Sequence, residues 1–124
     1  MRLLLDSNAF LWWRKGSRRL STRAAEEIRN PDNNIAVSIA TLWEITIKRA
    51  LGKLQFLEDF EPVMESEGFL PLAVAYHHLR ALERLPFHHR DPFDRLLIAQ
   101  ALAEGIPIAT SDRRFAAYGV QIVW

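Results

Sequence analysis

The sequence predicts an α/β fold in which helices cover both faces of a mainly parallel central sheet. Two observations support this prediction. Short apolar runs typical of strands alternate with helical segments of roughly ten residues, and several of these runs end at residues that favour the start of a helix. The 124 residues, of which 49% are hydrophobic and 25% charged, suit a single globular domain over residues 1–124.

The first half of the chain carries clear start and stop signals for its elements. Asp6-Ser7-Asn8 offers capping residues ahead of the first helix, Pro31 ends the second, and Gly52 follows the third where a left-handed residue is favoured. The expected elements are a strand at Leu3–Leu5, helices over 9–13 and 21–30, a strand at Ile35–Val37, a helix from Ser38 or Thr41 to about Leu51, and a helix over Glu58–Glu67.

The second half continues the alternation. Asp91-Pro92 supplies a cap and a proline suited to the first turn of a long helix, whose apolar stripe includes Leu97, Ile98 and Ala101 and which ends at Gly105. The other expected elements are an apolar run at Phe69–Val74, a helix over Ala75–Leu85, and strands at Ile106–Thr110 and Val120–Val123 on either side of a short connection.

Composition excludes several classes of protein. The chain has no cysteine, so disulfides and thiolate chemistry are excluded, and a reducing compartment is expected. No apolar run approaches the roughly 20 residues of a membrane span, and the amino-terminal run is too short for a secretion signal. We therefore expect a cytoplasmic protein without membrane contact. The net charge of +1 means that any affinity for nucleic acid must come from local basic clusters.

Four acidic residues are the main candidates for chemistry. In parallel sheets the carboxyl ends of the strands meet at one edge, which brings together side chains far apart in the sequence. Two carboxylates about 4 Å apart repel by roughly 4 kcal/mol at an effective dielectric near 20. A fold that gathers four of them therefore needs bound cations, and oxygen ligands suit Mg²⁺ or Mn²⁺. The four are Asp6, Glu44, Asp94 and Asp112.

Each acid also has a local interpretation that needs no metal. Asp6 and Asp112 could cap the helix or turn that follows them. Glu44 could pair with Lys48 one helical turn away, and Asp94 could simply suit the positive end of its helix. These local roles are independent of one another, whereas a metal site requires all four acids to converge. The predicted topology favours convergence.

The stretches around these acids resemble a known family. They are Leu4-Leu5-Asp6-Ser7-Asn8-Ala9, Ser38-x-x-Thr41-x-Trp43-Glu44-Ile45, His89-Arg90-Asp91-Pro92-Phe93-Asp94-Arg95-Leu96-Leu97-Ile98-Ala99-Gln100-Ala101 and Thr110-Ser111-Asp112-Arg113-Arg114-Phe115. In this order they are similar to the motifs of PIN domains, and most of all to those of VapC-type toxins of bacterial toxin–antitoxin pairs.

The resemblance implies a PIN-like three-layer α/β/α sandwich that cleaves RNA phosphodiesters through a water activated by Mg²⁺ or Mn²⁺. It assigns the metal and the catalysis to Asp6, Glu44, Asp94 and Asp112. Asp91 then becomes the helix cap or a partner that supports the metal ligands. A cognate antitoxin protein that blocks the acids is implied as well, and so is a homodimer, which the large aromatic side chains also favour.

Basic and hydroxyl side chains beside the acids are candidates for contacts with the substrate. These candidates are Arg95, Arg113, Lys48, Ser7, Asn8, Thr110 and Ser111. The paired histidines His77-His78 and His88-His89 match no closed zinc motif. We expect His88, His89 and Arg90 to line the loop beside the acids.

Two other functions remain open on the residues alone. A phosphatase with an aspartate nucleophile would also place an acid after the first strand, but it would want a second acid at position 8, where the chain has Asn8. An RNA- or protein-binding module with a vestigial acidic pocket is the non-enzymatic alternative. The complete set of four acids favours a nuclease over both.

Overall fold

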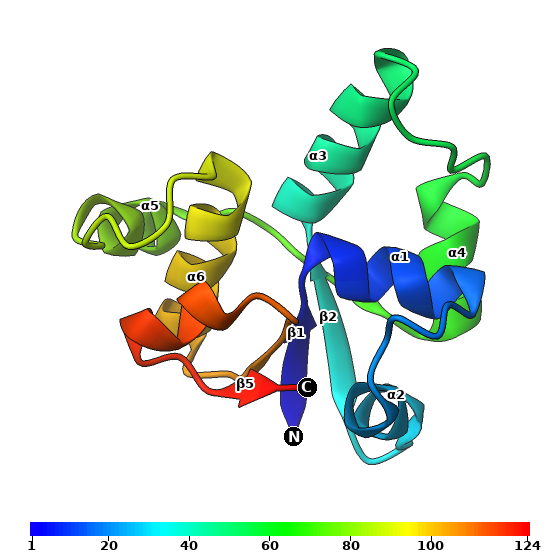
Figure 1. Cartoon of the computed structure of the whole chain (residues 1–124), viewed down its shortest axis with the longest axis horizontal. Coiled ribbons are helices and arrows are strands. Elements are labelled where there is room, and N and C mark those ends of the chain that lie inside the picture. The colour runs from blue at the N-terminus through cyan, green and yellow to red at the C-terminus, as the bar shows by residue number, and fades with distance from the viewer.

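A five-stranded parallel sheet forms the centre of the molecule (Figure 1). The computed structural model describes residues 1–124. Its strands are β1 (Arg2–Leu5), β2 (Asn34–Ser38), β3 (Leu70–Leu72), β4 (Ile108–Ala109) and β5 (Ile122–Val123), in the spatial order β3-β2-β1-β4-β5. Its helices are α1 (Ser7–Lys15), α2 (Thr22–Arg29), α3 (Ile39–Ala50), α4 (Phe60–Glu67), α5 (Tyr76–Glu83), α6 (Pro92–Glu104) and the 3₁₀ helix η1 (Arg113–Tyr118).

The alternation of side chains along the strands creates two apolar cores, one on each face of the sheet. Leu3 and Leu5 of β1 belong to the core formed with α1 to α4, which includes Phe10. Leu4 belongs to the opposite core, where it joins Leu97 of α6 and residues of α5 and η1. Figure 1 shows α1, α2 and α4 on one side of the sheet and α5 and α6 on the other. The predicted three-layer α/β/α sandwich is therefore confirmed.

Strand register aligns the ends of the central strands. Leu5 at the end of β1 lies level with Val37 of β2 and Ala109 of β4. The residues that follow these three positions consequently emerge at the same edge of the sheet. Asp6 is one of them.

Helix boundaries follow the capping residues closely. The side chains of Asp6, Ser21, Ser38 and Asp91 accept hydrogen bonds from backbone N–H groups of the helices they precede. From the sequence, α3 could start at either Ser38 or Thr41, and the structure places its cap at Ser38. None of the helices combines the length and the apolar composition that crossing a membrane requires.

Three strands are shorter than the apolar runs that predicted them. β4 and β5 pair over only two residues each, through Ile108 with Ile122 and Ala109 with Val123. β3 covers Leu70–Leu72 of the predicted run at Phe69–Val74. The remaining apolar residues of these runs, such as Phe69 and Ile106, instead pack into the two cores.

Candidate metal-binding site

A cavity of about 390 Å³ opens at the carboxyl edge of the sheet. It is lined by all four predicted acids and by Asp91, together with Ser7, Asn8, Leu11, Ile45, Lys48, Lys53, Leu54 and Ser111. The acids come from the end of β1, the middle of α3, the first turn of α6 and the segment after β4. The convergence that the topology predicted is therefore present in the structure.

Asp6 caps α1 and lies deep in the cavity. Its Oδ1 accepts the N–H of Ala9 at 2.8 Å, and the side chain is buried. The pKa of Asp6 is raised from 3.8 to about 6 chiefly because burial disfavours the charged form. Hydrogen bonds from Thr110 and Ala9 oppose the shift, while the charges of Asp112 and Glu44 add to it. The capping role and a place in the acidic cluster thus coexist in one residue.

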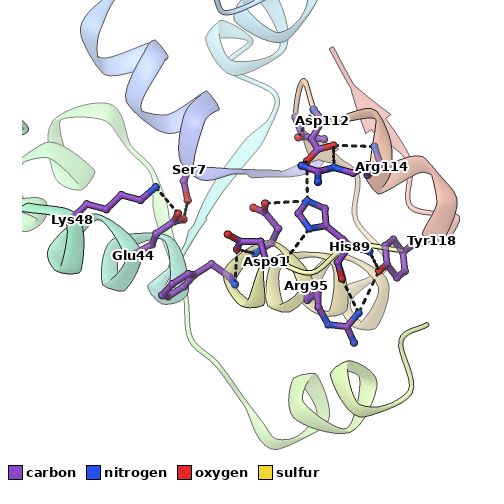
Figure 2. Close-up of polar contacts among 12 residues, drawn as sticks. Ser7, Glu44, Lys48, His89, Asp91, Arg95, Asp112, Arg114 and Tyr118 are labelled. Carbon is purple, nitrogen blue, oxygen red and sulfur yellow. Dashed lines mark hydrogen bonds and ion pairs between the residues drawn. The ribbon is translucent and has the colours of Figure 1, made fainter. Parts of the chain in front are cut away.

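Glu44 projects from α3 into the cavity and has two partners (Figure 2). Ser7 Oγ donates to Oε1 at 2.6 Å, and Lys48 Nζ lies 2.9 Å from Oε2. The pair with Lys48 is the local interpretation considered from the sequence. It does not remove Glu44 from the acidic cluster, because the carboxylate still adds to the repulsion felt by Asp6 and Asp94.

Asp94 stands in the first turn of α6, directly behind the cap. The Oδ1 of Asp91 accepts the N–H groups of Phe93 and Asp94 at 2.9 and 3.0 Å, so Asp91 is the cap that the sequence suggested. The pKa of Asp94 is raised from 3.8 to about 7, first by burial and then by the charge of Asp91. Asp6 and Glu44 contribute further repulsion, and His89 opposes it.

Asp112 caps η1 and is the acid whose charge is best balanced. Arg114 donates from Nε to Oδ1 at 3.0 Å and from Nη2 to Oδ2 at 2.9 Å, and the backbone N–H of Arg114 also reaches Oδ1. Burial alone would raise the pKa of Asp112, but these bonds and one from His89 outweigh burial and lower the pKa to about 2. Asp112 is therefore charged at neutral pH.

His89 is the site residue that sequence reasoning assigned least well. We expected it only to line the loop, yet its ring is buried and its Nε2 lies 2.8 Å from Asp112 Oδ2 and 3.2 Å from Asp94 Oδ2 (Figure 2). His88, by contrast, is exposed. The sequence offered one signal for this placement. His89 stands two residues before the helix cap Asp91, so it must lie near the first turn of α6, which carries Asp94.

The hydroxyl and amide candidates divide into two groups. Ser7, Asn8 and Ser111 line the cavity, and their role in orienting water or phosphate stays a prediction. Thr110 is fully buried, and its Oγ1 accepts the N–H of Asp112 at 3.0 Å. Thr110 therefore supports the two neighbouring acids from behind, and its expected contact with substrate is not supported by the structure.

The basic candidates also need correction at two positions. Arg95 is buried, and its guanidinium donates to the carbonyl oxygens of Pro86 and Leu85 at 2.8 and 3.3 Å. The structure therefore does not support the expectation that Arg95 binds phosphate beside the acids. Successive residues on a helix point about 100° apart, so Arg95 turns away from the cavity that Asp94 faces. Arg113 is exposed but does not line the acidic cavity, whereas Arg114 contacts Asp112 directly and Lys48 lies on the rim.

A second group of histidines and an acid lies at the carboxyl end of α6, away from the first turn that carries Asp94. The Nε2 atoms of His77 and His78 are 2.9 and 3.1 Å from Glu104 Oε2. The N–H of Ala75 donates to Nδ1 of His78, which leaves the proton of that ring on Nε2. His78 Nε2 is accordingly a donor to Glu104 rather than a metal ligand, and the group ties α5 to the end of α6.

Comparison with known proteins places these features in context. The PIN domain family model matches residues 3–121. The chain is 29% identical over 123 residues to Ribonuclease VapC22 of Mycobacterium tuberculosis, covering 94% of this chain and 91% of that protein. Its fold is similar to VapBC2 from Rickettsia felis bound to a promoter DNA fragment (TM-score 0.67, 14% identity, 98% and 97% of the chains covered) and to a toxin–antitoxin complex from Klebsiella pneumoniae (TM-score 0.65, 18% identity, 98% and 96% covered).

Proposed function

Because the chain belongs to the PIN domain family, we propose that it is a metal-dependent endoribonuclease that hydrolyses RNA phosphodiesters and serves as the toxin of a toxin–antitoxin pair. The observation that carries the proposal is the convergence of Asp6, Glu44, Asp94 and Asp112 on one cavity. The ribonuclease VapC22, which aligns along nearly the whole chain, supports the choice of RNA as the substrate.

The residues of the cavity fit a hard divalent cation. Their donors are carboxylate oxygens, which Mg²⁺ and Mn²⁺ prefer, and the cavity presents no thiolate. Asp6 and Asp94 have raised pKa values because they are buried and lie near other acids, so a cation bound between them would favour their charged forms. We propose Mg²⁺ as the cofactor, with Mn²⁺ as a substitute. When bound, the cation supplies the charge that activates a water molecule and stabilises the phosphate.

The side chains of the cavity have distinct proposed roles. Asp6 and Asp94 hold the cation, and Glu44 and Asp112 contribute directly or through water. Ser7 fixes one oxygen of Glu44 through its 2.6 Å hydrogen bond. Lys48 on the rim and Arg114 over Asp112 supply positive charge where the flanking RNA phosphates would lie.

Two protein partners are part of the proposal. One of the similar solved structures, from Klebsiella pneumoniae, is a toxin–antitoxin complex, which supports a cognate antitoxin for this chain. A homodimer is supported by an exposed aromatic surface on α3, where Trp43 is 58% exposed and packs edge-on against Phe93 of α6 at 5.0 Å. Large aromatic side chains of this kind are enriched at protein interfaces.

Incubation of the purified protein with total RNA, followed by mapping of the cut ends, tests the proposed function. We expect cleavage in Mg²⁺, none in EDTA, and at least about a 100-fold loss of rate in Asp94→Asn, the loss typical when one electrostatic element of an active site is removed. Asp59→Asn is the matched control, because Asp59 is exposed, lies outside the cavity and makes no capping bond. Cleavage at the wild-type rate by folded Asp94→Asn would refute the site.

A further inference from the structure

His89 lies between two of the acids that we assign to the cation. It sits in the loop between α5 and α6, and its ring is only 2% exposed. Its Nε2 is 2.8 Å from Asp112 Oδ2 and 3.2 Å from Asp94 Oδ2, and these three atoms lie within 4.8 Å of one another. The ring could thus either share a metal with the two acids or donate a hydrogen bond to them.

The opposite side of the ring decides between these two roles. The backbone N–H of Asp91 donates to Nδ1 of His89 at 3.1 Å. Since Nδ1 must offer its lone pair to this N–H, the ring proton is on Nε2. A ring nitrogen that carries a proton cannot bind a metal, so Nε2 donates to Asp112 Oδ2, and the same N–H lies 3.2 Å from Asp94 Oδ2. In metal-bound histidines the arrangement is reversed, because the nitrogen away from the metal is the one that donates.

The ring is also held in place by its surroundings. Phe115 packs against it edge-on at 5.7 Å. The backbone N–H of His89 donates to Tyr118 Oη at 2.8 Å. The buried guanidinium of Arg95 donates to the carbonyl oxygens of Pro86 and His89 in the same loop and to Tyr118 Oη. Figure 2 shows its contacts with His89 and Tyr118. The Nε2–H donor therefore has a fixed position between the two carboxylates.

We propose that His89 is a positioning residue that sets the spacing of Asp94 and Asp112 for the divalent cation. The inference rests on the proposed function. Asp94 belongs to α6 and Asp112 to the segment after β4, and the two negative charges would separate without a donor between them. The Nε2–H donates to one oxygen of Asp112, lies beside one oxygen of Asp94 and leaves the other oxygen of Asp94 for the cation. Arg95 follows Asp94 directly in the sequence but contacts neither acid. It acts indirectly, because its hydrogen bonds to Pro86 and His89 hold the loop that carries the ring.

Titration with Mn²⁺, followed by calorimetry, tests this role without relying on catalysis. We expect His89→Leu to weaken Mn²⁺ binding by about 10- to 100-fold, the usual loss when a partner of a metal ligand is removed. His89→Gln keeps an N–H donor and should stay within a few-fold of wild type. His88→Leu is the matched control, since the exposed neighbouring ring contacts Tyr118 and neither acid, and its Mn²⁺ affinity should equal that of wild type.

The outcomes separate the two proposals. Wild-type Mn²⁺ affinity in His89→Leu would overturn the positioning role alone. Absence of Mn²⁺ binding in the wild-type protein would overturn the proposed function and this inference with it. Nitrogen-detected NMR of the wild-type histidine rings, in the apo and the Mg²⁺-loaded protein, decides the matter even if His89→Leu does not fold. A proton on Nε2 supports the role, and a proton on Nδ1 overturns it.

Discussion

The four carboxylates of the cavity differ in how far protein charges balance them. Asp112 is paired with Arg114, and Glu44 is paired with Lys48. Neither Asp6 nor Asp94 forms an ion pair with a lysine or an arginine. Burial and the neighbouring acids raise their pKa values to about 6 and about 7. The need for an added cation is therefore greatest at Asp6 and Asp94.

Glu44→Gln tests whether Glu44 serves the site rather than the fold. The change removes a charge that repels Asp6 and Asp94, and it forfeits an i,i+4 pair with Lys48 worth only about 0.2–0.5 kcal/mol. We expect the apo protein to melt within about 2 °C of wild type, and its stabilisation by Mn²⁺ to fall. Glu104→Gln is the control, because Glu104 accepts from His77 and His78, and its loss should lower the melting temperature. A large loss of apo stability in Glu44→Gln would make Glu44 structural.

At the scale of elements, the residues that start helices also place the acids in the cavity. Asp6 caps α1, Asp91 caps α6 next to Asp94, and Asp112 caps η1. The positive ends of these helices face the cavity, where they favour negative charge. Helix initiation and the assembly of the acidic cluster therefore depend on the same few residues.

Asp91→Ala and Asp91→Asn together separate capping from charge. Removal of the cap in Asp91→Ala should lower the free energy of unfolding by about 1 kcal/mol, because two N–H groups of α6 lose their acceptor. Asp91→Asn keeps an acceptor oxygen and should be nearly as stable as wild type. Both variants should lower the pKa of Asp94, since the charge of Asp91 raises it. Urea denaturation measures the first effect, and equal stability of all three proteins would contradict the capping role.

The elements show what the sequence could and could not predict. Asp6 and Asp112 could be placed because they follow strands whose ends meet at one sheet edge, and Asp94 because it follows a recognisable cap. The contacts of His89 could not be predicted, since they depend on the path of an irregular loop. Arg95 was misplaced because proximity in sequence to Asp94 does not mean the same direction on a helix.

At the scale of the whole molecule, the acidic cluster makes the stability of the apo protein depend on pH. Asp6 and Asp94 have pKa values of about 6 and about 7 in the folded state against 3.8 as the ordinary value. Between pH 3.8 and these raised pKa values, the native state holds protons that the unfolded state has lost. The free energy of unfolding therefore falls as the pH rises toward 7. The lowered pKa values of Asp112 and Glu104, both about 2, affect stability only at lower pH.

Thermal melting in EDTA at pH 5 and pH 8 measures this dependence. Because these two acids are charged at pH 8, we expect the melting temperature in EDTA to be several degrees lower at pH 8 than at pH 5. Adding Mg²⁺ or Mn²⁺ at pH 8 should raise it again, since the cation binds the charged carboxylates. The double variant Asp6→Asn, Asp94→Asn is the control, because it removes both titrating groups and should flatten the difference. An equally large difference in the double variant would show that other groups cause it.

We propose that four acids from separate elements form one binding site for a divalent cation. A crystal structure of the protein grown with Mn²⁺ tests it most directly, through the anomalous scattering of manganese. We expect a manganese peak in the cavity, within coordination distance of Asp6 and Asp94. A structure with no peak there, or with manganese bound only at another place on the molecule, would contradict it.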